Sequence, residues 1–385
     1  MEENYSVSST FKLVTLGIVV AGIITISLGL FINPERTWAN FLLSNYYFIS
    51  IIVGATFFLA IQYVTQSGWS AMFIRIPHAI GVYMPVAAII ILFLIFGMHS
   101  IYHWSIPGVA ELHPEIAHKF PYLNIPFFFV RLVIFFALWI LMTWLLRKTS
   151  LKEDQENNLK YFYKSEHYSR IYIFILAVTF SLLTFDLIMS IDVAWFSTIF
   201  AVKNFVSGFY HAVSVITLIV ILLNRSGYYR DLSNPHLRYF SRYIFILGIL
   251  WAYLWFIQYI IIWFGNIQEE TIYYVIRTEG KWKTLFFLNI ILNWALPFFI
   301  LLPSRTNTNK IVLILVSIIL IVGHWVDLYL QIMPGSIGEF NIGFIEVGIF
   351  AGFAGLFIFI VSRSLSRMPL IPKNHPYLGE SMNLH

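Results

Sequence analysis

Long apolar runs separated by short polar stretches make up most of the chain. The runs lie at about 11–32, 41–65, 79–99, 126–146, 170–190, 204–223, 240–264, 284–302, 311–333 and 343–362. Each is close to the ~20 residues that a helix needs to cross ~30 Å of hydrocarbon. Lipid offers no partner to open backbone groups, and the runs lack the alternation of membrane strands. We therefore predict one all-α integral membrane domain over residues 1–385, with about ten transmembrane helices.

The positions of Lys and Arg predict the orientation of these helices, because basic loops stay in the cytoplasm. On these boundaries 17 of the 24 basic residues lie in the even-numbered loops and the termini, and 6 lie in the odd-numbered loops. Both termini are therefore expected to be cytoplasmic. The first run is too long for a signal peptide and is expected to be retained. Residues 363–385 contain three prolines and are predicted to form an extended cytoplasmic tail along a partner.

Composition narrows the possible functions. The chain is 59% hydrophobic and 11% charged, whereas soluble domains carry roughly 25% charged residues. The net charge of +5 comes from short loops and gives no reason to expect nucleic-acid binding. The chain has no cysteine, so it cannot itself hold a thiol-ligated iron–sulfur cluster, a covalently attached c-type haem or a disulfide. No metal site is predicted.

Several ionisable side chains fall inside the apolar runs, where each costs several kcal/mol unless it is paired or hydrated. With the predicted orientation they gather in the outer half of the membrane. The candidates for a proton path or a quinone pocket are Asp186, Asp192, His211, His324, Asp327, Arg131, Glu346 and His99. His324 and Asp327 share one helix face because they are three residues apart. Buried carboxylates and imidazoles can take up and release protons near neutral pH.

Other interpretations of these residues stay open. They could be hydrogen-bonding groups that hold the helices together. His99, His211 and His324 lie at similar depth and could ligate a haem b. Pro85 and Pro297 could break helices as in a secondary transporter of a small solute, although their positions do not correspond between the two halves of the chain. Arg75, His78 and Lys203 lie at membrane borders and are interpreted as contacts to lipid headgroups.

One run is similar to a family signature. Asp186-Leu-Ile-Met-Ser-Ile-Asp192-Val-Ala-Trp195-Phe-Ser-Thr-Ile-Phe200 resembles the NrfD-like, or polysulfide-reductase-type, membrane subunits, in which an acidic residue, Met-Ser and a second acidic residue precede Trp-Phe-Ser-Thr. Weaker matches are Arg75-Ile-Pro-His78, Asn266-Ile-Gln-Glu-Glu-Thr271 and His324-Trp-Val-Asp327. Together they look most like the smaller of the two quinone-subunit homologues in bacterial alternative complex III.

The resemblance implies ten helices that contain two four-helix bundles, in a bacterial inner membrane. It implies a subunit of a quinol:cytochrome c or quinol:oxidase oxidoreductase that is not catalytic alone. The expected partners are a larger NrfD-like sister subunit, an iron–sulfur protein, a multihaem cytochrome c and a terminal oxidase. Haem and iron–sulfur clusters would belong to these partners, with menaquinone or its quinol and lipids nearby.

Carried over by position, Asp186 and Asp192 match the two acidic residues of the signature, and His324 and Asp327 match a polar pair on the ninth span. Many relatives have Pro-His before the Trp, where this chain has Val193-Ala194. The missing imidazole favours quinol oxidation in the larger sister subunit. This chain would then supply a proton path or act as a purely structural docking subunit.

Overall fold

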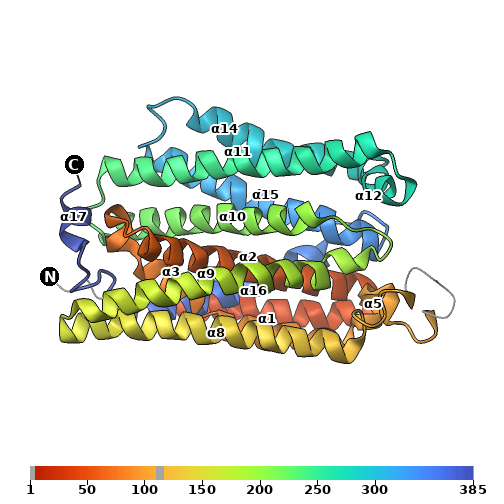
Figure 1. Ribbon diagram of the computed structural model, residues 1–385, viewed down its shortest axis with the longest axis horizontal. Coiled ribbons are helices and arrows are strands. Elements are labelled where there is room, and N and C mark those ends of the chain that lie inside the picture. Colours follow the sequence, from red (N-terminus) through yellow and green to blue (C-terminus); the bar gives the residue numbers. More distant parts are fainter. Residues whose placement is uncertain (1–4, 110–116, 385) are drawn as a thin grey trace.

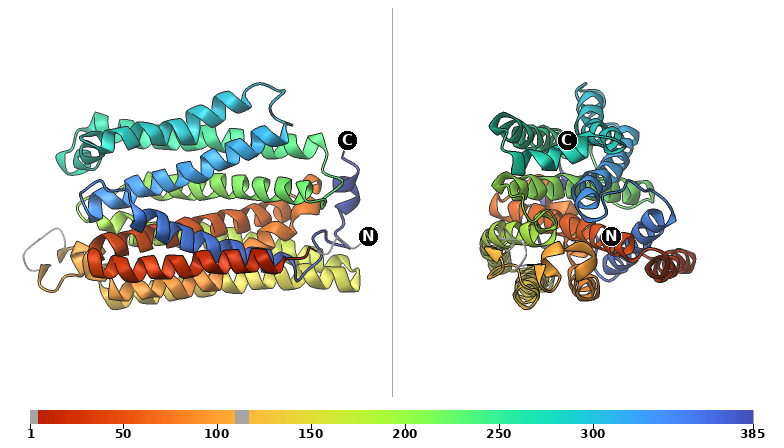
Figure 2. Two further views of the ribbon diagram at one scale, coloured as in Figure 1. Left: turned by 180° about the vertical axis from the view of Figure 1, so that it is seen from behind. Right: turned by 90° about the vertical axis from the view of Figure 1, so that its right-hand side faces the viewer.

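The computed structural model describes residues 5–109 and 117–384. All regular elements within these ranges are helical, and ten helices are long and apolar enough to cross a membrane. The helices run side by side along the long axis of the molecule, and both termini lie at one end (Figures 1 and 2). The prediction of an all-α, multi-pass membrane protein is confirmed. Below, the termini end is the end that carries the N- and C-termini, and the opposite end is the other one.

The ten spans differ in length and regularity. In chain order they are α1 (Ser9–Ile32), α2 (Pro34–Val64), α3 and α4 (Arg75–Gly81 and Met84–Leu92, continued by η2, Phe93–Phe96), α8 (Ile125–Glu156), α9 (Leu159–Leu187, continued by η4, Met189–Ile191), α10 (Thr198–Arg225), α11 (Asn234–Gly265), α13 to α14 (Trp282–Ile290 and Leu296–Leu301, joined by the π-turn η5, Ile291–Ala295), α15 (Lys310–Ser336) and α16 (Phe344–Leu365). The shorter elements are η1 (Gly68–Phe73), α5 (Met98–Ile101), η3 (His103–Ser105), α12 (Gln268–Thr278) and α17 (Leu378–Met382).

Several helices continue beyond the apolar runs that predicted them, because local capping sets their ends. The Asn33 side chain accepts a hydrogen bond from the Arg36 N–H and starts α2. Asn157 is left-handed (φ 44°) and ends α8, and the Asn158 side chain caps α9 at the Lys160 N–H. Asn tolerates this backbone conformation better than most residues and is a favoured N-cap. Most of residues 147–169, between the fourth and fifth apolar runs, therefore belongs to these two helices.

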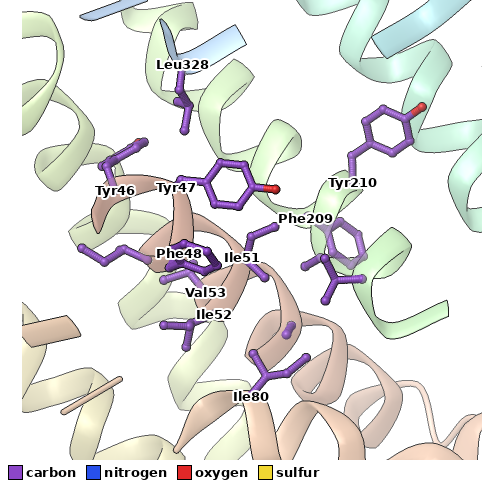
Figure 3. Packing of buried hydrophobic residues seen from close by; sticks show 14 of the residues in the cluster. Tyr46, Tyr47, Phe48, Ile51, Ile52, Val53, Ile80, Phe209, Tyr210 and Leu328 are labelled. Atoms are coloured by element: carbon purple, nitrogen blue, oxygen red, sulfur yellow. The ribbon is translucent and has the colours of Figure 1, made fainter. Parts of the chain in front are cut away.

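Helix α2 forms the centre of the fold. It packs against α9, α10, α15, α16 and α3, and its aromatic and branched side chains fill the space between them (Figure 3). The crossing with α10 is close: a Cβ at Gly54 would lie 2.3 Å from the Gly208 carbonyl oxygen, so no larger residue fits there. Burial on all sides explains why α2 carries apolar residues on every face.

Eight of the ten spans, including α2, pack in two closed sets. Helices α2, α4, α8 and α9 contact one another in a ring, and α10, α11, α13 to α14 and α15 form a second ring. Helix α1 lies outside both, against α16 and the start of α2. At its contact with α16 a Cβ on Gly22 would be 2.4 Å from the Gly352 Cα. The backbones of these two helices therefore touch.

The chain after α16 differs from the predicted extended tail. It folds back over the termini end and finishes in the short helix α17, near the loops of the first half of the chain (Figure 1). The Ser381 hydroxyl donates to the Trp69 carbonyl (2.9 Å), and the Lys373 N–H donates to Asp154 (2.8 Å). The prolines interrupt regular structure but do not prevent packing, so the segment after α16 packs against other parts of its own chain.

Candidate functional site

A buried ion pair lies at the centre of the second ring of helices. The Lys203 ammonium on α10 is 2.8 Å and 3.1 Å from the two carboxylate oxygens of Asp327 on α15. Both side chains are almost fully enclosed, with 4% and 2% exposure. Asn289 of α13 donates a further hydrogen bond to Asp327 (3.1 Å), and the Ser207 hydroxyl lies 3.3 Å from the same carboxylate. Charge and hydrogen bonds together make burial of these ions tolerable.

Two stacked histidines lie deeper in the bundle, beside this ion pair. The rings of His211 and His324 are 4.2 Å apart and nearly parallel (19°). His324 Nε2 is 2.7 Å from the Ser50 hydroxyl on α2, and Ser207 lies 3.4 Å from Nδ1 of each ring. Axial haem ligands must point at the iron from opposite faces. Face-to-face rings do not fit this arrangement, so a haem between His211 and His324 is not supported.

His211 is placed between two oxygen acceptors. Its Nδ1 is 2.6 Å from the Ser207 carbonyl, and its Nε2 is 2.8 Å from the Asn293 side-chain oxygen. Both contacts are hydrogen bonds only when both ring nitrogens carry hydrogen, and a neutral ring requires the Asn293 amide to rotate. The site can therefore accommodate one extra proton by a local rearrangement.

Asn293 belongs to the π-turn η5, which interrupts the eighth span. Its amide donates to the Asn289 side chain (2.6 Å) and to the Gly323 carbonyl on α15 (2.9 Å). A Cβ at Gly323 would lie 2.6 Å from the Asn293 oxygen, so glycine is needed for this approach. Single π-turns frequently mark functional sites. Here Asn293 in the π-turn faces His211, and Asn289, four residues earlier in α13, faces Asp327.

A small cavity of about 30 Å³ adjoins the ion pair on the side of the opposite end of the bundle. Its lining combines the polar groups of Lys203, Asp327, Gln258, Gln331 and Arg277 with aromatic side chains. Among the described residues, the amide nitrogen of Gln258 and both side-chain polar atoms of Gln331 find no hydrogen-bond partner, although all three atoms are buried. A polar space of this volume holds about one or two waters, which would satisfy these groups.

Arg277 of α12 links the cavity to the surface. Its guanidinium donates to Asp192 (3.0 Å) and to the carbonyls of Leu330 (2.7 Å) and Gln331 (3.0 Å). It also lies 3.4 Å above the ring of Tyr273, which stacks on Trp195 at 3.9 Å. Burial raises the pKa of Tyr273, so this phenol stays protonated. The Asp192 side chain is 24% exposed, so it connects these buried residues with the protein surface.

These residues form one series, here called the polar route. It runs from Asp192 through Arg277 and the cavity to Lys203 and Asp327, and ends at His211 and His324. Four of the residues predicted from the sequence, Asp192, Asp327, His211 and His324, lie along this series. The others belong to separate interactions.

Arg131 and Asp186 form their own buried pair between α8 and α9. The guanidinium binds both carboxylate oxygens (2.8 and 3.0 Å) and donates to the Tyr122 carbonyl (2.9 Å). Its cationic carbon also lies 3.8 Å above the Tyr122 ring. Burial and the nearby Asp186 charge raise the pKa of Tyr122 to about 12. This pair joins the first ring of helices, apart from the polar route.

Glu346 and His99 also lie elsewhere. Glu346 binds Arg36 through two hydrogen bonds (2.7 and 2.5 Å), accepts one from Asn40 (2.9 Å), and caps the first turn of α16 at the Gly343 N–H (2.8 Å). The His99 ring contacts the nearby Ser105 hydroxyl (3.0 Å). Glu346 therefore links α16 to α2.

The interpretation of Arg75, His78 and Lys203 as headgroup contacts is wrong. Arg75 is 0% exposed and donates to Ser150 and Asp154 of α8, and His78 is buried beside it. Lys203 is the buried partner of Asp327. All three lie at the ends of apolar runs, where sequence alone does not distinguish a side chain facing lipid from one facing a neighbouring helix.

Sequence reasoning also missed Arg277, Asn289, Asn293 and Gln331. Spacing along the helices was the available signal for the last three of these residues. Lys203, Ser207 and His211 recur every four residues, His324, Asp327 and Gln331 follow at intervals of three and four, and Asn289 and Asn293 are four apart. Each set marks one helix face. A search for polar stripes, rather than for single charges, would have found the part of the route that lies on α10, α13 and α15, but not Arg277.

Fold and site together define a polytopic helical membrane protein with a polar series buried between its helices. No family model matches the chain, and no curated protein matches it either.

Proposed function

We propose that the chain is a membrane subunit of a quinol-oxidising respiratory complex of the alternative complex III type, and that the polar route carries protons between Asp192 and the histidine pair. The observation that carries the proposal is the buried Lys203–Asp327 pair, which lies between a hydratable cavity and two stacked imidazoles. Quinol oxidation releases two protons for each electron pair and needs titratable acceptors nearby.

The chemistry of the route favours protons over larger cargo. Its cavity of about 30 Å³ has room for water, whereas a quinone ring or a solute molecule is larger. Imidazoles, a carboxylate and hydroxyls exchange protons by small rotations, such as that of the Asn293 amide. Protons therefore suit this site better than a quinone pocket or a substrate site of a secondary transporter.

The proposal extends to architecture and placement. The two rings of helices correspond to the two four-helix bundles of NrfD-like subunits, with α1 and α16 outside. We place the termini end in the cytoplasm of a bacterium, so that Asp192 opens toward the outer face. An iron–sulfur protein, a multihaem cytochrome c, the larger sister subunit and a terminal oxidase would be the partners, and they would hold the redox centres.

The test uses Asp327→Asn and His324→Ala in the complex purified from cells that express the variant chain. Quinol turnover and proton release are measured after reconstitution into vesicles. We expect loss of proton release or of coupled turnover in both variants, while the complex still assembles.

Asp186→Asn and Glu346→Gln are the matched controls, because each removes a buried carboxylate that lies outside the polar route. Both should lower the yield or stability of the complex but leave proton release per quinol unchanged. Normal proton release in Asp327→Asn and His324→Ala would leave the route a structural role only and would refute the proposed proton path.

A further inference from the structure

A cavity of about 360 Å³ lies at the termini end, between the first turn of α1 and the last turn of α16. Its lining comprises Val7, Lys12, Phe359, Ser362, Arg363, Ser366 and Arg367. Three of these side chains are cations and none is an acid. The cavity is far larger than a water site and falls in the size range of small-molecule pockets.

The three cations of this cavity are exposed side chains, and none of them binds a carboxylate of the described residues. Within residues 5–109 and 117–384, Lys12, Arg363 and Arg367 form no ion pair, whereas Arg36, Arg75, Arg131, Lys203 and Arg277 each bind a carboxylate. Arg147 of α8 adds to the excess: its guanidinium binds the Ser364 hydroxyl (2.7 Å) and repels Arg367. An anion would relieve this repulsion.

Helix direction separates this site from ordinary helix ends. Arg363 and Arg367 lie at the end of α16, where cations interact favourably with the helix dipole. Lys12 lies in the first turn of α1, where a cation is unfavourable, and this turn has no acidic residue to balance it. The N–H groups at a helix start already carry partial positive charge. A cation at that position, facing two arginines, is explained by a bound anion.

The surroundings identify the source of the anion. Directly beyond the cavity, α1 and α16 present apolar side chains outward, with Leu13 72%, Leu16 43% and Ile358 45% exposed. These surfaces belong to spans that face hydrocarbon. A ligand with a phosphate between the cations could lay its acyl chains along this surface.

We propose that the cavity binds the headgroup phosphate of an anionic phospholipid, with Lys12, Arg363 and Arg367 as the binding residues. The site is independent of the polar route and of the proposed function. Each cation near an anionic lipid contributes about fivefold in affinity, which corresponds to about 1 kcal/mol. Removal of all three should weaken binding on the order of a hundredfold.

The experiment measures lipid adducts on the delipidated full chain in mild detergent by native mass spectrometry. Phosphatidylglycerol, phosphatidylethanolamine and inorganic phosphate are the probes. We expect phosphatidylglycerol to bind in preference to phosphatidylethanolamine, and Lys12→Gln with Arg363→Gln and Arg367→Gln to abolish that preference. The matched control, Arg225→Gln with Arg230→Gln and Arg238→Gln, removes the same charge from other positions at the same end of the molecule and should bind normally.

Each result decides the question. Equal loss in the control would show only non-specific attraction, and unchanged binding in the triple variant would refute the site. Displacement of the lipid by millimolar inorganic phosphate would make it a free-phosphate site instead. If the triple variant does not fold, Lys12→Gln alone should still lose about fivefold, and Lys12→Arg with Arg363→Lys and Arg367→Lys should bind as the wild type does. Failure of either expectation also refutes the proposal.

Discussion

Breaking the Lys203–Asp327 pair should destabilise the protein more than removing both charges. In Lys203→Met the Asp327 carboxylate keeps its hydrogen bond from Asn289 but loses its counter-charge in an enclosed site. Removal of one partner of a buried pair costs about 3–5 kcal/mol, whereas replacement of both by apolar residues is often nearly neutral. We therefore expect about 3–5 kcal/mol for Lys203→Met and for Asp327→Leu, and a smaller loss for the double variant.

The assay is unfolding in sodium dodecyl sulfate, followed by tryptophan fluorescence of the purified chain, for the wild type, both single variants and the double variant. Glu156→Gln serves as the control, because Glu156 is exposed and accepts a hydrogen bond from the exposed Tyr161 hydroxyl (2.6 Å). Substitutions at such surface positions usually change stability by less than about 0.5 kcal/mol. If the double variant lost the sum of the two single effects, the two charges would not be coupled and our description of the polar route would be wrong.

Two further predictions concern other parts of the fold. Gly22→Leu should separate α1 from α16 and lower the stability by about 1–3 kcal/mol or more, measured by thermal unfolding in detergent. Gly17→Leu is the control and should be neutral, because a Cβ added at Gly17 would meet nothing within 4 Å. Equal effects of the two substitutions would contradict the close contact. Burial and the charge of Arg75 lower the pKa of His375 to about 4, below the unfolded value of about 6.5. The docked tail therefore binds fewer protons than a released one, so its stability is complete above a pH of about 6.5 and declines as the pH falls toward about 4. Limited proteolysis of the tail should accelerate over that window, and His375→Phe should abolish the dependence; a pH-independent wild type would argue against it.

The spans were predictable from the sequence because hydrocarbon imposes length and apolarity on every one of them. The pairing of the polar residues was not. Asp192, just after η4, and Arg277, on the short helix α12, lie 85 positions apart, and nothing local indicates that α12 folds back to bring them together. Likewise, the rotation of α10 decides whether Lys203 faces lipid or Asp327. Glu346 caps its own helix at the Gly343 N–H, which is a local contact, whereas the central position of Asp327 depends on Lys203 of α10 and Asn289 of α13.

The folded tail has a consequence for biogenesis. The segment after α16 supplies hydrogen-bond partners to Trp69, Asp154 and Ser233, which belong to three separate parts of the chain made much earlier. During synthesis on the ribosome these residues emerge without those partners and wait until almost the whole chain has been inserted. A nascent chain arrested before Leu370 would leave these groups unpaired at the termini end, where chaperones and membrane proteases can recognise them. Docking of the C-terminal segment therefore marks a chain whose synthesis and insertion are almost complete.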